Sequence, residues 1–233
     1  MNAAAIVVAG GSGSRLGAPG GKQLATLLGE PVVSWALKAL DAAPDIELLV
    51  VVCPADRVDS FADAAESLCL ETPIRFASSG PTRQESVASG LTQVPCEFEL
   101  IAIHDGARPL LRPETVGEAI ALLAASPAAD GVVVGHPSID TVKFVDEGRI
   151  TSTPERSTIW MAQTPQVFRA SVLRAAMRSA EETGFVGTDD ASVVGHFGGT
   201  VLMFEGPRDN IKITVAEDIA LAEAVLAQRA GGS

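Results

Sequence analysis

A glycine-rich loop directly after a short apolar run is the feature that most restricts how this chain can fold. Segment 6–23 has the sequence IVVAGGSGSRLGAPGGKQ, and the apolar run at 4–8 ends where its glycines begin. Such a run predicts a buried strand that leads into a tight loop. Glycine lets backbone N–H groups approach and surround a bound group. Because Arg15 and Lys22 are the loop's only charged residues, the loop is suited to bind a polyphosphate.

Two better-known glycine-rich motifs do not match this loop. The dinucleotide motif G-x-G-x-x-G would require glycine at position 16, which is Leu16. A Walker A loop ending at Lys22 would also require glycine there, and Ser or Thr in place of Gln23. The simplest alternative interpretation is a flexible connection between a strand and a helix, with solvated charges.

Strand-like and helix-like segments alternate after the loop. The expected strands are 48–53, 74–77, 100–103, 131–135 and 200–204, and the expected helices are 31–40, 56–68, 82–91, 113–125, 170–182, one starting at 188, and 214–228. This order predicts an α/β fold with a Rossmann-like, mostly parallel sheet and helices on both faces. Ligands in such sheets bind beyond the carboxyl ends of the strands, where loops 9–23, 78–83 and 104–109 would meet.

Several helix starts carry capping signals. Thr82 and Thr214 each begin a T-x-x-E pattern, which predicts a capping box. Asp56 is expected to cap the helix that runs to about residue 68. Asp189 and Asp190 place acids in the first turn of the helix after residue 188, where they favour its dipole.

The alternation breaks in the middle of the chain. Segments 141–145 and 150–153 flank the turn sequence DEGR, which predicts a hairpin. Pro165 predicts that segment 160–168 is an edge strand or contains a bend. The hairpin is either a projecting arm that mediates a dimer or a surface excursion. We therefore expect a single domain over 1–233, with a β-arm insertion at about 138–166.

Composition excludes several classes of function. The formal net charge of −12 argues against broad nucleic-acid binding, and the apolar runs are too short to span a membrane. No Lys or Arg precedes the first apolar run, which argues against a signal peptide. Cys53, Cys69 and Cys96 are odd in number and widely spaced, so reduced thiols in a cytoplasmic protein are expected.

Individual polar residues have both functional and ordinary interpretations. Asp105 follows a strand and could bind Mg²⁺ through carboxylate oxygens, or form an Asx turn beside Arg108. His104 is expected to be a packed histidine. Lys212 could simply be solvated, and Arg156 could pair with the neighbouring Glu155.

Taken together and in order, these loops resemble one family. The motifs are AGGSGSRLG…KQ, SSGPTRQESV, HDGARP, DTVKFV, TPERS…QTPQVF, TDDAS and DNIKIT. They are similar to 2-C-methyl-D-erythritol 4-phosphate cytidylyltransferases from about residue 4 to residue 226. The opening loop alone marks the wider sugar-nucleotidyltransferase class, and the later motifs in sequence support the narrower family.

The resemblance implies transfer of CMP from CTP, the co-substrate, to methylerythritol phosphate, with Mg²⁺ and release of pyrophosphate. It implies that four residues act in catalysis, namely Arg15, Lys22, Arg156 and Lys212. The nucleotide and its metal, the latter at Asp105, would be bound by Ala9, Gly10, Gly11, Gly13, Gly80, Arg83, Ser86, Asp105, Gly106 and Ala107. The acceptor would be bound by Thr141, Arg156, Thr164, Asp209 and Lys212. The family's arm is exchanged across a homodimer, so Thr141 and Arg156 are candidates to serve the neighbouring subunit's site.

The chain departs from the family pattern at two places. Pro81 has no N–H to offer a base, where family members often carry an acidic residue, and Gly106 stands where Ala is also common. The nucleophile would be a substrate phosphate oxygen that is already ionised at neutral pH, so no general base is required. This agrees with loops that contain no evident Ser-His or His-carboxylate set.

Three alternatives remain open at this point. A ribitol 5-phosphate cytidylyltransferase would share most of these loops and differ in its acceptor. A regulatory module that binds a nucleotide without chemistry is disfavoured by the combination of Arg15, Lys22 and Lys212. A dehydrogenase is disfavoured by Leu16.

Overall fold

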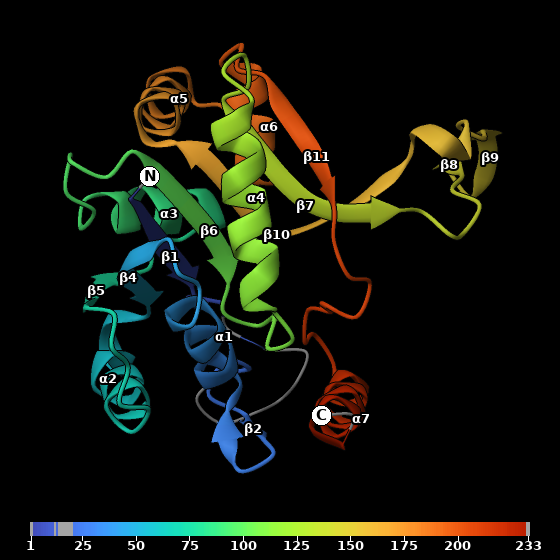
Figure 1. Cartoon of the computed structure of the whole chain (residues 1–233). Coiled ribbons are helices and arrows are strands. Elements are labelled where there is room, and N and C mark those ends of the chain that lie inside the picture. Colours follow the sequence, from blue (N-terminus) through green and yellow to red (C-terminus); the bar gives the residue numbers. More distant parts are fainter. Residues whose placement is uncertain (1, 12, 14–20, 232–233) are drawn as a thin grey trace.

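A computed structural model describes residues 2–11, 13 and 21–231 (Figure 1). Its core is a seven-stranded sheet in the order β11-β7-β10-β6-β1-β4-β5. The strands are β1 (Ala3–Val8), β4 (Ile46–Cys53), β5 (Ile74–Ser78), β6 (Leu100–Asp105), β7 (Gly131–Pro137), β10 (Trp160–Arg169) and β11 (Val201–Glu205). All neighbours are parallel except β10, which runs antiparallel to both β6 and β7. The predicted α/β fold with a mostly parallel sheet is therefore confirmed.

Helices cover both faces of the sheet (Figure 1). One face packs against α1 (Val32–Asp41), α2 (Val58–Glu66) and α4 (Pro113–Ala125). The other packs against α3 (Arg83–Leu91), α5 (Ala170–Thr183) and α6 (Asp190–His196). Successive side chains of β1 point to opposite faces of the sheet. Ala5 and Val7 face the first group of helices, and Ala4 and Ile6 face the second. A strand buried on both faces needs the continuous apolar sequence found here.

The C-terminal helix forms a smaller third cluster. Helix α7 (Ala216–Gly231) packs through Ala222 against Leu27, Val32 and Ile213. Leu27 belongs to a small hairpin of β2 (Thr26–Leu27) and β3 (Glu30–Pro31). This packing holds the segment before α7 beside the loop that follows β1, although the two are about 190 residues apart in sequence.

The predicted hairpin projects from the sheet (Figure 1). Strands β8 (Phe144–Asp146) and β9 (Arg149–Ser152) pair only with each other and are exposed along their whole length. A short helix, η2 (Arg156–Thr158), leads back to β10. A two-stranded hairpin is marginal on its own in water. Exposed Phe144, Val145 and Ile150 leave apolar surface on this arm.

Three details of the sequence prediction need correction. Strand β10 lies inside the sheet and not at an edge; Pro165 is accommodated because residues 163–165 pair with neither neighbour, at the predicted bend. Asp56 does not cap α2, since it lies within η1 (Ala55–Arg57) ahead of that helix. At α7 the carboxylate of Asp218, not Glu217, accepts hydrogen bonds from the N–H groups of Thr214 and Val215. The capping box of Thr82 and Glu85 is confirmed.

Among the described residues, no helix combines the length and apolar character needed to cross a bilayer.

Candidate active site

A cavity of about 180 Å³ lies where the loops after β1, β5 and β6 meet. Of the residues expected from the sequence, its walls contain Gly10, Gly11, Lys22, Gly80, Arg83, Ser86, Asp105, Ala107 and Lys212. They come from four separate segments, and the last is supplied by the chain between β11 and α7. The predicted convergence of loops at the carboxyl end of the sheet is thus present in the structure.

Two glycines allow the loops to approach closely. A Cβ on Gly10 would lie 2.3 Å from Cβ of Ser79, and one on Gly80 would lie 2.5 Å from Cβ of Glu85. Both distances are shorter than real Cβ contacts, so a larger residue at position 10 would push the β1 loop away from the β5 loop, and one at position 80 would push the β5 loop away from α3. Ala9 fixes the start of the first loop by donating from its N–H to the carbonyl of Val52.

The rest of the first loop is described only in part. Gly13 adopts a left-handed φ of +64°, and a Cβ there would lie 2.5 Å from the backbone nitrogen of Lys22. Gly13 therefore lies directly against Lys22, which is almost entirely buried. Arg15 lies outside the described residues.

Helix α3 aims two side chains at the cavity. Its capping box satisfies the first N–H groups, and the helix then places Arg83 and Ser86 on the cavity wall. The hydroxyl Oγ of Ser86 accepts from the N–H of Gly80 at 3.1 Å and donates to the carbonyl of Thr82 at 2.9 Å. The start of α3 and the β5 loop are therefore one rigid unit.

Asp105 ends β6 and is surrounded by three cations. Its carboxylate lies 2.7 Å from Nζ of Lys212, 3.2 Å from Nε of Arg83 and 3.8 Å from Nε of Arg108. Burial alone would raise the pKa of Asp105, but the charges of Arg83, Lys212 and Arg108 outweigh it and hold the pKa well below its usual range. Asp105 is thus an anion throughout the neutral range.

A buried network supports Asp105 from behind. Oγ1 of Thr164 accepts from the N–H of Asp105 at 3.1 Å and lies 3.0 Å from Nδ1 of His104. Nδ2 of Asn210 donates to the carbonyl of Thr164 at 2.7 Å. Burial lowers the pKa of His104 to about 4, so its ring is neutral, as expected of a packed histidine. Thr164, expected at the acceptor, lies beneath Asp105 and not on the cavity wall. Gly106 also lies behind the wall, where its N–H donates to the carbonyl of Val8.

The remaining expected residues lie outside the cavity. Asp209 is held by Nη2 of Arg112 at 2.8 Å and by Nη2 of Arg229 at 3.0 Å. Thr141 and Arg156 are exposed at the base of the arm, and Nη1 of Arg156 donates to the carbonyl of Ile139 at 3.4 Å. Within the described part of one chain, neither arm residue reaches the cavity of its own subunit.

Sequence reasoning missed Asp190 as part of this cluster. Its carboxylate lies 2.7 Å from Nη1 of Arg83 and is buried at the start of α6. The TDDAS motif contained the signal, because two successive acids begin a helix and only one is needed as its cap. That one is Asp189, whose Oδ1 accepts from the N–H of Ser192.

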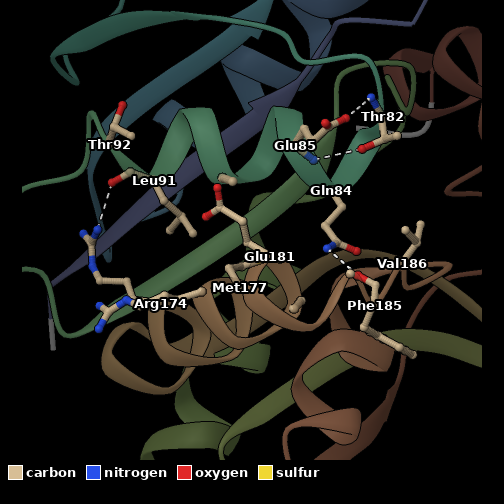
Figure 2. Close-up of a pocket in the computed structure, with 14 residues that line it drawn as sticks. Thr82, Gln84, Glu85, Leu91, Thr92, Arg174, Met177, Glu181, Phe185 and Val186 are labelled. Atoms are coloured by element: carbon tan, nitrogen blue, oxygen red, sulfur yellow. Dashed lines mark hydrogen bonds between the residues drawn. The ribbon is translucent and has the colours of Figure 1, made fainter.

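A larger groove of about 650 Å³ lies on the other side of α3, between α3 and α5 (Figure 2). None of the residues expected at the site lines it. Two of its polar side chains are engaged with the protein itself: Arg174 donates to the carbonyl of Leu91 and Gln84 to that of Phe185 (Figure 2). Arg174 also donates to the carbonyl of Val94. Volume alone does not identify the site, and the smaller cavity contains the convergent charges.

The donor groups of the smaller cavity are compatible with a nucleotide-borne magnesium ion. Among the described residues, no group of three His, Cys, Asp or Glu side chains could enclose a metal. Asp105 is the only carboxylate among the described residues that line the cavity. Mg²⁺ in phosphate-transfer sites is typically held by one or two carboxylates together with substrate phosphates and water. Asp105 fits that arrangement and would not bind the metal tightly without the nucleotide.

Comparisons with known proteins agree with this geometry. The family model described as "IspD: 2-C-methyl-D-erythritol 4-phosphate cytidylyltransferase" matches residues 3–228. Relatives of that name from Geobacter metallireducens and Synechococcus sp. are 38% and 41% identical, over 97% and 96% of this chain and the same shares of theirs.

Solved structures give the same result. The 4-diphosphocytidyl-2C-methyl-D-erythritol synthase of Anaerococcus prevotii is 29% identical, with a TM-score of 0.86, and the match covers 97% of this chain and 98% of that one. The 2-C-methyl-D-erythritol 4-phosphate cytidylyltransferase of Thermus thermophilus is 27% identical, with a TM-score of 0.76, over 97% and 100% of the two chains. The chain therefore belongs to the family of 2-C-methyl-D-erythritol 4-phosphate cytidylyltransferases.

Proposed function

We propose that this chain transfers CMP from CTP to 2-C-methyl-D-erythritol 4-phosphate, releasing pyrophosphate, and that the cavity bounded by Gly10, Lys22, Arg83, Asp105 and Lys212 is where the reaction occurs. The observation that carries the proposal is the charge of this cavity. Its described lining contains three cations, Lys22, Arg83 and Lys212, and a single carboxylate, in a chain of net charge −12. A local excess of positive charge on glycine-lined backbone is suited to a triphosphate.

The reaction is an in-line displacement at the α-phosphorus of CTP. A phosphate oxygen of the acceptor forms a bond to this phosphorus while the bond to the bridging oxygen breaks, and the electron pair leaves with pyrophosphate. The attacking oxygen is ionised at neutral pH, so no proton has to be removed. Catalysis then consists of positioning and of stabilising negative charge in the transition state.

Lys22 and the glycine loop supply that stabilisation in the proposal. Lys22 is buried at the cavity wall beside Gly11, so its ammonium is preorganised and incurs little reorganisation during the reaction. The loop Ala9–Gly13 would cradle the phosphates through backbone N–H groups that follow Ala9, whose own N–H is held by Val52. Arg15 would add a planar, forked donor. A magnesium ion held by Asp105 and the phosphates would neutralise charge on the leaving pyrophosphate.

The nucleoside would lie against the start of α3. Gly80, Arg83 and Ser86 are assigned to the cytosine, and Asp105, Gly106 and Ala107 to the ribose and metal. Support comes from their placement, since Gly80, Arg83, Ser86, Asp105 and Ala107 all line the cavity. Pro81 lines it as well and contributes no donor.

The acceptor would be held partly by a second subunit. Lys212 lines the cavity, whereas Thr141 and Arg156 lie on the projecting arm and do not reach it within one chain. An arm exchanged in a homodimer would deliver both residues to the neighbouring site. The exposed apolar side chains of Ile139, Phe144, Val145, Ile150 and Met161 support such an interface. Asp209 would bind an acceptor hydroxyl after release from Arg112 or Arg229.

The described cysteines, Cys53, Cys69 and Cys96, are all free thiols, which supports a reducing, cytoplasmic location.

The decisive experiment supplies CTP and Mg²⁺ with either methylerythritol phosphate or ribitol 5-phosphate, and scores pyrophosphate and the CDP-linked product. The proposal expects product from the first acceptor, with ribitol 5-phosphate used poorly or not at all. Preferred use of ribitol 5-phosphate would reassign the acceptor. CTP binding without turnover on either acceptor would reject the enzymatic function.

A further inference from the structure

Asp190 is a buried charge that the proposed reaction does not use. It is 1% exposed and is the first residue of α6. An ionised carboxylate taken out of water needs a charged partner or hydrogen bonds. Its partner is Arg83, with Nη1 of the guanidinium 2.7 Å from Oδ2 of the carboxylate.

The guanidinium of Arg83 is divided between two acids. Nη1 faces Asp190, while Nε donates to Oδ1 of Asp105 at 3.2 Å. An arginine that faces one carboxylate commonly forms a bidentate pair with it. Here the shortest contacts to the two acids come from different nitrogens, and among the described residues Nη2 donates no hydrogen bond. Because Arg83 lines the cavity, that group is left for a ligand.

Asp190 itself is held in place by the surrounding chain. On β10, Nε2 of Gln166 donates to Oδ2 of Asp189 at 2.9 Å, and Oε1 of Gln166 accepts from the N–H of Ala191 at 3.0 Å. On α3, Gln84 bonds to the carbonyl of Phe185 and to the N–H of Gly187. Gln166 therefore ties the start of α6 to β10, and Gln84 ties the residues just before α6 to α3, which carries Arg83.

Neither helix capping nor a contribution to stability explains why a buried acid occupies position 190. The cap of α6 is provided by Asp189, which accepts from the N–H of Ser192. Burial raises the pKa of Asp190 to about 6 although the charge of Arg83 opposes the shift, so keeping this carboxylate ionised is costly. Buried ion pairs are often no more stabilising than apolar side chains of similar volume.

We propose that Asp190 is a positioning residue, which holds Arg83 on the wall of the nucleotide cavity and keeps it from forming a bidentate pair with Asp105. The nucleotide then meets a guanidinium whose orientation is already fixed, and the second oxygen of Asp105 stays accessible to other cations. This inference rests on the proposed function, which assigns Arg83 to the cytosine of CTP.

The test is a double-mutant cycle on CTP affinity, measured by calorimetry with Mg²⁺ on wild type, Asp190→Asn, Arg83→Gln and the double variant. Asp190→Asn is expected to weaken CTP binding by roughly 10- to 50-fold, the scale of losing a charge-assisted contact. In the Arg83→Gln background the same change should alter the dissociation constant by less than about twofold, because Asp190 acts through Arg83. The KM for the acceptor should change little in Asp190→Asn.

Asp41→Asn is the matched control, since Asp41 accepts hydrogen bonds from the N–H groups of Glu71 and Thr72 at the far end of α1. It should bind CTP as wild type does. Unchanged CTP affinity in Asp190→Asn, or an equal loss in both backgrounds, would overturn the inference. If Asp190→Asn does not fold, the CTP affinities of Arg83→Gln and of the double variant are compared with each other. Equal affinities support the inference, and weaker binding by the double variant rejects it. Wild-type protein that binds no CTP would overturn the proposed function as well.

Discussion

Nζ of Lys212 lies 2.7 Å from Oδ2 of Asp105, so the segment before α7 closes over the carboxylate that ends β6. A divalent cation bound by Asp105 would need the oxygen that this ammonium now contacts. Lys212 and such a cation would therefore compete for one oxygen of Asp105, and a bound triphosphate would supply further oxygens to the cation. The same lysine would then be released toward the acceptor phosphate.

Replacing Lys212 by Met should strengthen binding of Mn²⁺, used as a probe for Mg²⁺, in the absence of nucleotide. We expect a gain of at least tenfold, since a unit charge ~5 Å from a divalent cation costs several kcal/mol even at an effective dielectric constant of ~20. Electron paramagnetic resonance of free Mn²⁺ measures the change. Lys38→Met, which removes a lysine paired with Glu30, is the control and should leave Mn²⁺ binding unaltered. Equal or weaker binding by Lys212→Met would show that the two cations do not compete.

Lys22→Ala should lower kcat by ~10²–10³, the scale of losing one preorganised donor to a transition-state oxyanion. Because the side chain is buried at the cavity, a water molecule that took its place would not stabilise the negative charge of the phosphates as well as the ammonium does. Steady-state kinetics with both substrates saturating measures the effect, and Lys38→Ala serves as the control. Turnover close to wild type in Lys22→Ala would remove this residue from the mechanism.

Two buried groups should give opposite contributions to the pH dependence of stability. Burial lowers the pKa of His104 from 6.5 to about 4, so its contribution is fully present above pH 6.5 and is lost as the pH falls toward 4. Burial raises the pKa of Asp190 from 3.8 to about 6, so its cost is present above pH 6 and is relieved as the pH falls toward 3.8. At ~1.4 kcal/mol per pKa unit, each amounts to roughly 3 kcal/mol over its range.

Urea unfolding between pH 7 and 4.5 should therefore separate the two single variants. In Asp190→Asn the free energy of unfolding should fall more steeply with acid than in wild type, because the compensating group is gone. In His104→Gln it should fall less steeply. The comparison uses the slope of the free energy of unfolding against pH and not its absolute value, because each variant also lacks native hydrogen bonds. Parallel curves for all three proteins would contradict the assignment of these groups.

Local signals in the sequence were sufficient for much of the fold and part of the site. The capping pattern at Thr82 predicted the start of α3. Strands that end at glycine or at Asp105 predicted which loops would meet, because the carboxyl ends of parallel strands share one edge. These features depend on residues close together in the chain, and local rules describe them well.

Interactions between distant segments could not be predicted from such local signals. Asp190 and Arg83 are more than a hundred positions apart, and neither spacing nor propensity indicates that they pair. The position of β10 inside the sheet depends on antiparallel pairing to β6 and β7, which outweighed the preference of Pro165 for an edge. At α7 both Glu217 and Asp218 could serve the first turn, and in the structure Asp218 accepts the hydrogen bonds.

The arm residue Arg156 should affect the acceptor and not CTP. It lies outside the cavity on an exposed element, so Arg156→Ala is expected to raise the acceptor KM while CTP affinity stays near wild type. Kinetics with each substrate varied in turn measures the change, and Arg149→Ala on the same arm is a control for the loss of charge. A collapse of CTP affinity with an unchanged acceptor KM would contradict this assignment.

Mixing the Lys22→Ala and Arg156→Ala variants, assayed at an acceptor concentration too low for either variant to turn over appreciably, should reveal which subunit Arg156 serves. If arms are exchanged in a homodimer, a Lys22→Ala subunit paired with an Arg156→Ala subunit has one site with both defects and one site with neither. A statistical mixture, refolded or co-expressed, should then recover roughly a quarter of wild-type activity, because half of the dimers are mixed and half of their sites are intact. If Arg156 served its own subunit, every site would keep one defect and mixing would restore nothing. Activity that stays at the level of the separate variants would therefore reject the exchanged arm, provided that tagged subunits confirm mixed dimers.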